Sequence, residues 1–304
     1  MTEILFEAYR PKSFEEVIGN EAVIEEIKAT VASGEIPHYL FYGPPGVGKT
    51  TTARIIHSVL DEMGLCSSYM SINASDERKI EVVREKIKGF VRTGTGDNRF
   101  KILFLDEMDS MPELPQEALR TLMEDYSDNC RFIISCNQIY KIIPAIQSRC
   151  ASYGFRPIER ETAINRLRYI VEQEEGEVAD EYIQQVYSKS NGDMRMSINL
   201  LQAAINGQMR NLDEVFHTDI YDGIIESIAS GNARQPMVDI DKLLEEGVDA
   251  KEILFGIYNS VKSNHSLENY ELLYKKMGEL NLALSNGVIP KIQFSWFVNE
   301  CTEE

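Results

Sequence analysis

The sequence is short of cysteine and has no long apolar run. Its five cysteines are odd in number and show no C-x-x-C spacing, so neither a disulfide framework nor a zinc site is expected. No stretch approaches the ~18–20 apolar residues of a membrane span. The N-terminus, Met1-Thr2-Glu3, has neither the basic nor the apolar region of a signal peptide. We therefore expect an intracellular protein with no membrane partner. The cysteines are Cys66, Cys130, Cys136, Cys150 and Cys301.

Basic residues are also scarce, because 31 Lys and Arg stand against 49 Asp and Glu, a net charge of −18. This balance by itself argues against nucleic acid as a partner. Residues 211–304 hold 17 acids and 7 bases, a net of −10, which is over half of the total. Residues 78–101, by contrast, hold eight bases and three acids. A basic segment in an acidic chain predicts a local binding surface for a polyanion.

Residues 43–50 match G-x-x-x-x-G-K-[ST] in full, between an apolar strand expected at 38–42 and a helix expected at 51–60. Backbone N–H groups of such a loop surround phosphate oxygens, and the helix N-terminus adds partial positive charge. Lys49 is expected to reach the β- and γ-phosphates of ATP, and Thr50 to offer its hydroxyl to Mg²⁺. The alternative is a glycine-rich turn that binds nothing. The predicted nucleotide-binding residues here are Gly43, Pro44, Pro45, Gly46, Val47, Gly48, Lys49, Thr50 and Thr51.

Two acids follow the apolar strand expected at 100–105. Asp106 at the strand tip can hold the Mg²⁺ shell, and Glu107 can polarise a water for in-line attack on the γ-phosphate. Transfer of a phosphoryl group to water needs such a base, so this pair predicts an ATPase. The alternative is an acidic turn that caps the helix after Pro112.

Three further polar residues are candidates for the same chemistry. Asn137 ends the strand expected at 131–136, where it can hydrogen-bond the attacking water or the γ-phosphate, although asparagine after a strand is usually turn chemistry. Arg195 lies in the first turn of a helix capped by Asp193, where a cation opposes the helix dipole unless a phosphate is near. Arg149 follows a short helix begun at Pro144 and can reach a neighbouring subunit's γ-phosphate. The alternatives are a solvated Arg195 and an Arg149 that meets carbonyls of its own helix.

The helix expected at 76–92 carries an apolar stripe, beside which Arg84, Lys88 and Arg92 form a row at intervals of four. Regular phosphate contacts need regularly spaced cations on a rigid element, so this row predicts DNA binding. The alternative is a solvated face, which most charge rows are.

Strand and helix patterns alternate in the first half of the chain, with a helix expected at 21–32 after the expected cap Asn20. A further strand is expected near 69–72 and a helix near 116–125. This pattern predicts a parallel sheet with crossover helices. After residue 157 the pattern is helical, with three helices expected in 160–206 and more from about 212 onward. We therefore expect an α/β nucleotide-binding domain at 1–157, a helical lid at 158–208 and an all-α domain at 209–304.

Together these motifs resemble those of the replication factor C small subunits, the AAA+ ATPases of archaeal and eukaryotic sliding-clamp loaders. The resemblance rests on eight segments, in order: Tyr9-Arg10-Pro11-Lys12, residues 17–21, the phosphate loop, residues 73–78, residues 106–111, Ser135-Cys136-Asn137, Ile146-Gln147-Ser148-Arg149-Cys150 and Gly192-Asp193-Met194-Arg195. The motif match covers about residues 5–205. It implies an AAA+ module, a lid and a C-terminal collar domain for oligomerisation.

The resemblance also implies partners and residue roles. The expected assembly is a heteropentamer with a large subunit and further small subunits, which opens a ring-shaped clamp (PCNA) and loads it onto primer–template DNA, with ATP hydrolysis triggering release. Arg149 is implied as the finger acting on a neighbour's ATP, Asn137 as sensor 1 and Arg195 as sensor 2. The compartment implied is the cytoplasm or nucleoid of an archaeon, or a eukaryotic nucleus. The implied adenine-pocket residues are Tyr9, Arg10, Pro11, Val17 and Ile18.

Two alternatives remain at this point. One is another oligomeric AAA+ ATPase that remodels protein or nucleic-acid complexes, such as an unfoldase. The aromatic–hydrophobic–glycine pore loop of such a protein is not evident, because Phe90-Val91 is followed by Arg92. The other is a structural subunit that does not hydrolyse ATP, an interpretation that leaves Glu107 and Arg149 unexplained.

Overall fold

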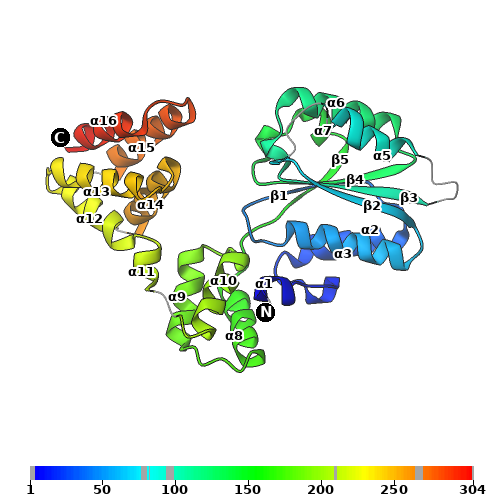
Figure 1. Cartoon of the computed structure of the whole chain (residues 1–304), viewed down its shortest axis with the longest axis horizontal. Coiled ribbons are helices and arrows are strands. Elements are labelled where there is room, and N and C mark those ends of the chain that lie inside the picture. Colours follow the sequence, from blue (N-terminus) through cyan, green and yellow to red (C-terminus); the bar gives the residue numbers. More distant parts are fainter. Residues whose placement is uncertain are drawn as a thin grey trace. The chain divides into compact units, whose positions relative to one another are not determined.

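The chain forms two compact units, Met1–Met209 and Arg210–Glu304, called here the N-terminal and the C-terminal unit (Figure 1). The computed structural model describes residues 4–76, 81, 83–93, 99–208, 211–263 and 270–302. Each unit has its own hydrophobic core.

A five-stranded parallel sheet forms the centre of the N-terminal unit, with the strand order β2-β3-β4-β1-β5. The predicted α/β fold with a parallel sheet is therefore confirmed. The strands are β1 (His38–Tyr42), β2 (Cys66–Asn73), β3 (Phe100–Asp106), β4 (Cys130–Cys136) and β5 (Cys150–Gly154). The edge strand β5 was not predicted, because its sequence, Cys-Ala-Ser-Tyr-Gly, lacks the apolar run that marks the central strands.

Helices cover both faces of this sheet, as Figure 1 shows, with α2 and α3 on one face and α5, α6 and α7 on the other. Successive residues of a strand point to opposite faces. Leu103 and Phe132 accordingly belong to one core cluster, and Phe104 and Ile133 to the other. Within the described residues of the unit, the α-helices are α1 (Leu5–Ala8), α2 (Glu21–Ser33), α3 (Lys49–Glu62), α5 (Lys88–Arg92), α6 (Glu113–Asp125), α7 (Pro144–Gln147), α8 (Arg160–Gln173), α9 (Asp180–Ser190) and α10 (Met194–Ile205).

The edge strand β5 lies in register with β1, so that His38 pairs with Cys150 and Tyr42 with Gly154. Arg149 therefore lies where β5 starts, and the phosphate loop lies where β1 ends. The N–H of Phe155 continues the pairing by donating to the carbonyl of Tyr42 at 2.7 Å. The parallel pair β1 and β5 thus connects the phosphate loop with the region around Arg149.

Two local expectations differ from the structure. Asn20 precedes α2 but does not cap it, because its side chain hydrogen-bonds both the N–H and the C=O of Arg156, at 2.8 and 3.1 Å. In the helix expected at 76–92, residues 77–80 and 82 lie outside the described residues, Val83–Ile87 form a π-helical turn and α5 follows. The spacing of four between Arg84 and Lys88 therefore does not belong to a regular α-helix.

The described part of the C-terminal unit is helical, as its sequence predicted. Its helices are α11 (Leu212–Val215), α12 (Thr218–Ala229), α13 (Arg234–Glu245), α14 (Ala250–Ser263), α15 (Tyr270–Ser285) and α16 (Pro290–Thr302). Gly231, Gly247 and Gly287 have positive φ values of 75°, 90° and 74° where helices end, as expected for glycine after a helix C-terminus. Among the helices of the described ranges, none combines the length and apolar character that a membrane span requires.

Candidate functional site

A cavity of about 280 Å³ lies between the phosphate loop, the ends of β3 and β4, the N-terminal segment and helices α8 and α10. Ligands of open α/β sheets bind at this carboxyl edge of the strands. Of the predicted residues, the following line the cavity: Tyr9, Arg10, Pro11, Val17, Ile18, Pro45, Gly46, Val47, Gly48, Lys49, Thr50, Thr51, Asp106, Glu107, Asn137 and Arg195. Gly43, Pro44 and Arg149 are not among the lining residues.

Lys49 is held inside the phosphate loop and is only 8% exposed. Its Nζ donates to the carbonyls of Gly43 at 2.7 Å and Pro44 at 2.6 Å, and to Oδ1 of Asn137 at 3.0 Å. Burial lowers the pKa of Lys49, although the nearby Asp106 opposes this shift. Lys49 thus lines the cavity with its ammonium group held between the phosphate loop and the end of β4.

Gly43 has a structural function beside the cavity. Its φ is 139°, and a Cβ at this position would lie 2.1 Å from the carbonyl oxygen of Phe155. Only glycine allows this backbone conformation together with so close an approach. The start of the loop is thereby fixed against the chain that follows β5.

Thr50 and Asp106 provide oxygen atoms that suit Mg²⁺. The hydroxyl of Thr50 donates to Oδ2 of Asp106 at 3.0 Å, across from α3 to the end of β3. Mg²⁺ in nucleotide sites is commonly held by one or two protein oxygens, with phosphate and water as the other ligands. The described residues hold no group of three His, Cys, Asp or Glu that could bind a metal. The hydroxyl of Thr50 and the carboxylate of Asp106 are oxygen ligands that fit an ion bound together with the nucleotide.

Ser135, at the end of β4, joins the two acids and was not predicted as a site residue. Its hydroxyl donates to Oδ1 of Asp106 and accepts the N–H of Glu107 at 3.3 Å. Glu107 has a φ of 55°, which only a minority of non-glycine residues adopt. Ser135 is 1% exposed, whereas Asp106 is half-buried and Glu107 is exposed, so the network is anchored from the interior at Ser135. The signal was present in the motif Ser135-Cys136-Asn137, in which only the last residue carries a predicted role.

Helix α10 brings Arg195 and its cap to the phosphate loop. Asp193 accepts the N–H of Met196 at 3.0 Å, which confirms the predicted cap. A Cβ on Gly46 would lie 1.9 Å from Oδ1 of Asp193, so the loop and the start of the helix are in close contact. The guanidinium of Arg195 lies 5.9 Å from the ring centroid of Phe6. Phe6 also lines the cavity and was not predicted.

The N-terminal segment is tied to α8 and to the turn that ends it. The hydroxyl of Tyr9 donates to Oε1 of Glu174 at 2.6 Å, and Nη2 of Arg166 donates to the carbonyl of Tyr9 at 3.0 Å. Burial, and next the hydrogen bond with Glu174, raise the pKa of Tyr9 to about 12. Arg166 lines the cavity and was missed, because nothing in the local sequence of α8 indicates which charged residue faces a ligand.

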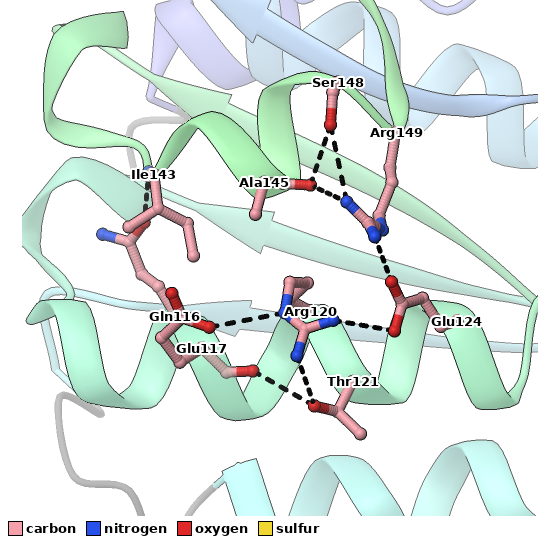
Figure 2. Close-up of polar contacts among 9 residues, drawn as sticks. All are labelled: Gln116, Glu117, Arg120, Thr121, Glu124, Ile143, Ala145, Ser148 and Arg149. Carbon is pink, nitrogen blue, oxygen red and sulfur yellow. Dashed lines mark hydrogen bonds and ion pairs between the residues drawn. The ribbon is translucent and has the colours of Figure 1, made fainter.

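Arg149 faces a different part of the surface, beside α6 and α7 (Figure 2). Its Nη1 donates to the carbonyl of Ala145 at 2.5 Å, and its Nη2 pairs with Glu124. The contact with its own helix is the one that the alternative interpretation expected. One third of the side chain remains exposed.

Lys88 and Arg92 of the predicted basic row are exposed. The side chain of Arg84 lies outside the described residues. Figure 1 shows α5 on the same face of the sheet as α6.

The order of the strands, the phosphate loop after β1 and the acidic pair after β3 define a P-loop ATPase of the AAA+ class. Residues 39–157 match the ATPase family associated with various cellular activities (AAA). The fold is similar to that of the Thermotoga maritima RuvB Holliday junction branch migration motor, with a TM-score of 0.57 and 21% identity over 72% of this chain and 79% of that one. At this identity the likeness shows the fold alone.

Sequence relatives identify the family. The replication factor C small subunit of Archaeoglobus fulgidus is 37% identical over 97% of this chain and 96% of its own length. Replication factor C subunit 4 of Encephalitozoon cuniculi is 37% identical over 96% and 95%, and the small subunit of Saccharolobus solfataricus 36% over 96% and 92%. The chain belongs to the replication factor C small-subunit family. The predicted family, AAA+ ATPase activity, nucleotide binding and clamp-loader function are thereby confirmed, and the chain is a subunit of a multi-subunit complex.

Proposed function

We propose that this chain binds Mg·ATP in the cavity at the end of the sheet and hydrolyses it within a clamp loader assembled with a replication factor C large subunit and further small subunits. The observation that carries the proposal is the convergence of Lys49, Asn137, Thr50, Asp106 and Glu107 on one cavity, from three different strands and their following loops. Such a convergence supplies phosphate binding, a metal ligand and a base within one volume.

The predicted residues of the cavity have the following proposed roles. Lys49 neutralises the phosphates, while Thr50 and Asp106 would hold Mg²⁺, which would balance the charge developing on the phosphate oxygens. Glu107 accepts the proton of the attacking water, and Asn137 orients that water or the γ-phosphate. Arg195 contacts the phosphates from α10, opposite the phosphate loop. Tyr9, Arg10, Pro11, Val17 and Ile18 surround the base.

Arg149 is proposed to act on the ATP of a neighbouring subunit. It does not line the cavity of its own chain, and its exposed side chain can be reached by another molecule. A guanidinium brought to a γ-phosphate stabilises the charge of the transition state and can raise the rate by about 10³–10⁵.

Lys88 and Arg92, together with Arg84, are proposed to contact the backbone of primer–template DNA. The support is their location on one short segment of an otherwise acidic chain and the exposure of Lys88 and Arg92. Exposed charges more than about 8 Å apart are largely screened at physiological salt. The net charge of the whole chain therefore matters less to DNA than these nearby cations.

The remaining proposals concern organisation. Residues 1–157 form the AAA+ module, residues 158–208 a lid that contacts the nucleotide through Arg195, and residues 209–304 a collar for oligomerisation. The clamp is PCNA, which the loader opens with ATP bound and releases on DNA after hydrolysis. The protein works inside the cell, where chromosomal DNA is copied.

The test is to purify the chain with and without a large subunit and to measure the mass of the complex, its ATPase activity and its loading of PCNA onto primed DNA. We expect a defined hetero-oligomer whose ATPase is stimulated by clamp and primed DNA. Lys49→Ala serves as the control, since it removes the phosphate contact. ATPase activity that responds to an unfolded protein, and not to clamp or DNA, would favour a remodelling ATPase and contradict the proposal.

A further inference from the structure

Glu124 of α6 lies between two arginines that come from different elements (Figure 2). One carboxylate oxygen, Oε1, pairs with Nη2 of Arg149, which stands between α7 and β5. The other, Oε2, accepts from Nη1 of Arg120 at 2.8 Å, one turn earlier on α6. These three residues are called here the Arg149 cluster. A single carboxylate therefore holds both guanidinium groups.

The cluster fixes Arg149 without using all of its donors. A guanidinium has five N–H groups. In Arg149, Nη2 meets Glu124, while Nη1 meets the carbonyl of Ala145 at 2.5 Å and the hydroxyl of Ser148 at 3.4 Å. Its Nε donates to no acceptor among the described residues, and the contact with Glu124 uses only one of the two carboxylate oxygens. The guanidinium is thus held at two nitrogens and can still donate to a second anion.

Arg120 in turn fixes the carboxylate of Glu124. Its Nε donates to Oε2 of Glu117 at 3.3 Å, so that it is anchored along α6 on both sides. The hydrogen bond from Arg149 is the main cause that lowers the pKa of Glu124 below its ordinary value, and the charge of Arg120 lowers it further. The carboxylate therefore stays ionised at neutral pH. Glu124 and both of its partners are between 30% and 40% exposed. Ion pairs with this exposure contribute little to stability, so stability alone does not explain the arrangement.

We propose that Glu124 is the positioning residue for Arg149, holding its guanidinium in the orientation in which it meets the phosphate of a neighbouring subunit's nucleotide. This inference rests on the proposed role of Arg149 in trans. A flexible arginine on a surface visits many rotamers, and an active-site group misplaced by about 1 Å can cost about 10²-fold in rate. The carboxylate removes that freedom before the neighbour docks, while Arg120 prevents the carboxylate itself from rotating.

The test uses complexes assembled from variant chains and a large subunit. In Glu124→Gln the shape is kept, but the charge that holds both arginines is removed. We expect kcat of the assembled ATPase to fall about 10- to 100-fold, with KM for ATP changed less than twofold, because ATP binds to residues of the other subunit. Glu124→Asp, which keeps the charge, should recover part of the loss. Glu113→Gln is the matched control, since Glu113 lies in the first turn of the same helix but contacts neither arginine of the cluster, and it should stay near the parent rate.

A double variant shows whether Glu124 acts on the rate through Arg149 or independently of it. If Glu124 acts through Arg149, Glu124→Gln combined with Arg149→Ala should be no slower than Arg149→Ala alone. An additive loss would overturn the proposal, as would a parent rate in Glu124→Gln. A faster Glu124→Gln would also overturn it, since Glu124 would then compete with the phosphate for Arg149. If Arg149→Ala itself leaves the assembled ATPase unchanged, the proposed trans role fails as well, which distinguishes the two failures.

Discussion

The nucleotide cavity and the Arg149 cluster hold their cations in opposite ways. Lys49 is 8% exposed and has three oxygen acceptors from its own chain within 3.0 Å. Arg149 is 33% exposed and is held by one carboxylate, one carbonyl and one hydroxyl, at the surface. Both are single cations at the ends of the same strand pair, yet one is enclosed and the other remains accessible.

The difference in exposure between Lys49 and Arg149 fits their proposed roles, one toward a nucleotide of its own chain and the other toward a nucleotide of a neighbouring chain. A group that acts on a ligand of its own chain can be buried, because the ligand enters the cavity and replaces internal partners. A group that acts on another chain must stay exposed until that chain arrives. Its orientation then has to come from charge-assisted hydrogen bonds with its neighbours, since burial is not available. Comparing variants of the two regions tests this distinction.

The largest effect is expected from Arg149→Ala. ATP binding to the isolated chain should be intact, because Arg149 does not line its cavity. In the assembled complex, turnover at the neighbouring site should fall by about 10³–10⁵. The measurement mixes variant and parent subunits and follows single-turnover hydrolysis at the neighbour's intact site. A loss restricted to the variant's own site would break the comparison, because Arg149 would then act in cis.

A smaller loss is expected from Glu107→Gln, which belongs to the enclosed region. The amide keeps the size of the side chain but cannot accept the proton of water, so hydrolysis should fall by about 10²–10⁴. Nucleotide affinity, measured by equilibrium binding, should stay within a few-fold of the parent. Equal turnover in variant and parent at saturating ATP would contradict the assignment of Glu107 as the base.

Changes on the proposed DNA surface should be smaller still. Lys88→Ala with Arg92→Ala should weaken DNA-stimulated ATPase of the assembled complex, while basal ATPase stays near the parent value. The salt dependence of DNA binding should become shallower by about 0.9 for each duplex phosphate that the variant no longer neutralises. Lys262→Ala, a change to a cation of the C-terminal unit, is the control. An unaltered slope in the double variant would mean that the row is only a solvated face.

The smallest effect is on the free energy of unfolding. It concerns His38 in the strand pair between the two regions and appears only at acid pH. Burial, and next the charge of Arg131, lower the pKa of His38 to about 4 from an ordinary 6.5. The unfolded chain therefore binds this proton first, and stability present above about pH 6.5 is lost as the pH falls toward 4. Urea unfolding at pH 7.5 and 4.5 measures the loss. His38→Asn should reduce this loss, because an amide does not titrate in this range. Its oxygen can still accept the N–H of Phe132, which Nδ1 of His38 accepts at 3.2 Å. Equal losses in both proteins would assign the pH dependence to other groups.

Cavity-lining residues that belong to a short motif were predictable from the sequence. The phosphate loop, the acidic pair and the cap Asp193 are each specified by neighbours within a few positions, and the cavity brings the predicted lining residues together. The contacts of Tyr9 with Glu174 and of Ser135 with Asp106 were not predicted. They join residues 165 and 29 positions apart, and such pairing depends on how the elements pack. The strand β5 was missed for a related reason, since it is stabilised by pairing with β1 and not by its own composition.

The register of β1 with β5 has a consequence for counting. Arg149 precedes β5 and the phosphate loop follows β1. If Arg149 acts in trans, as proposed, the chain has its arginine finger at one end of the strand pair and its nucleotide site at the opposite end. Chains that join the finger of one to the nucleotide site of the next form a directional, head-to-tail series. In a series that does not close into a ring, one terminal chain has a nucleotide without a finger, and the other has a finger without a nucleotide to meet. An open assembly of such chains is therefore never equivalent at its two ends, and a subunit that needs no finger, or offers none, suits one of those ends.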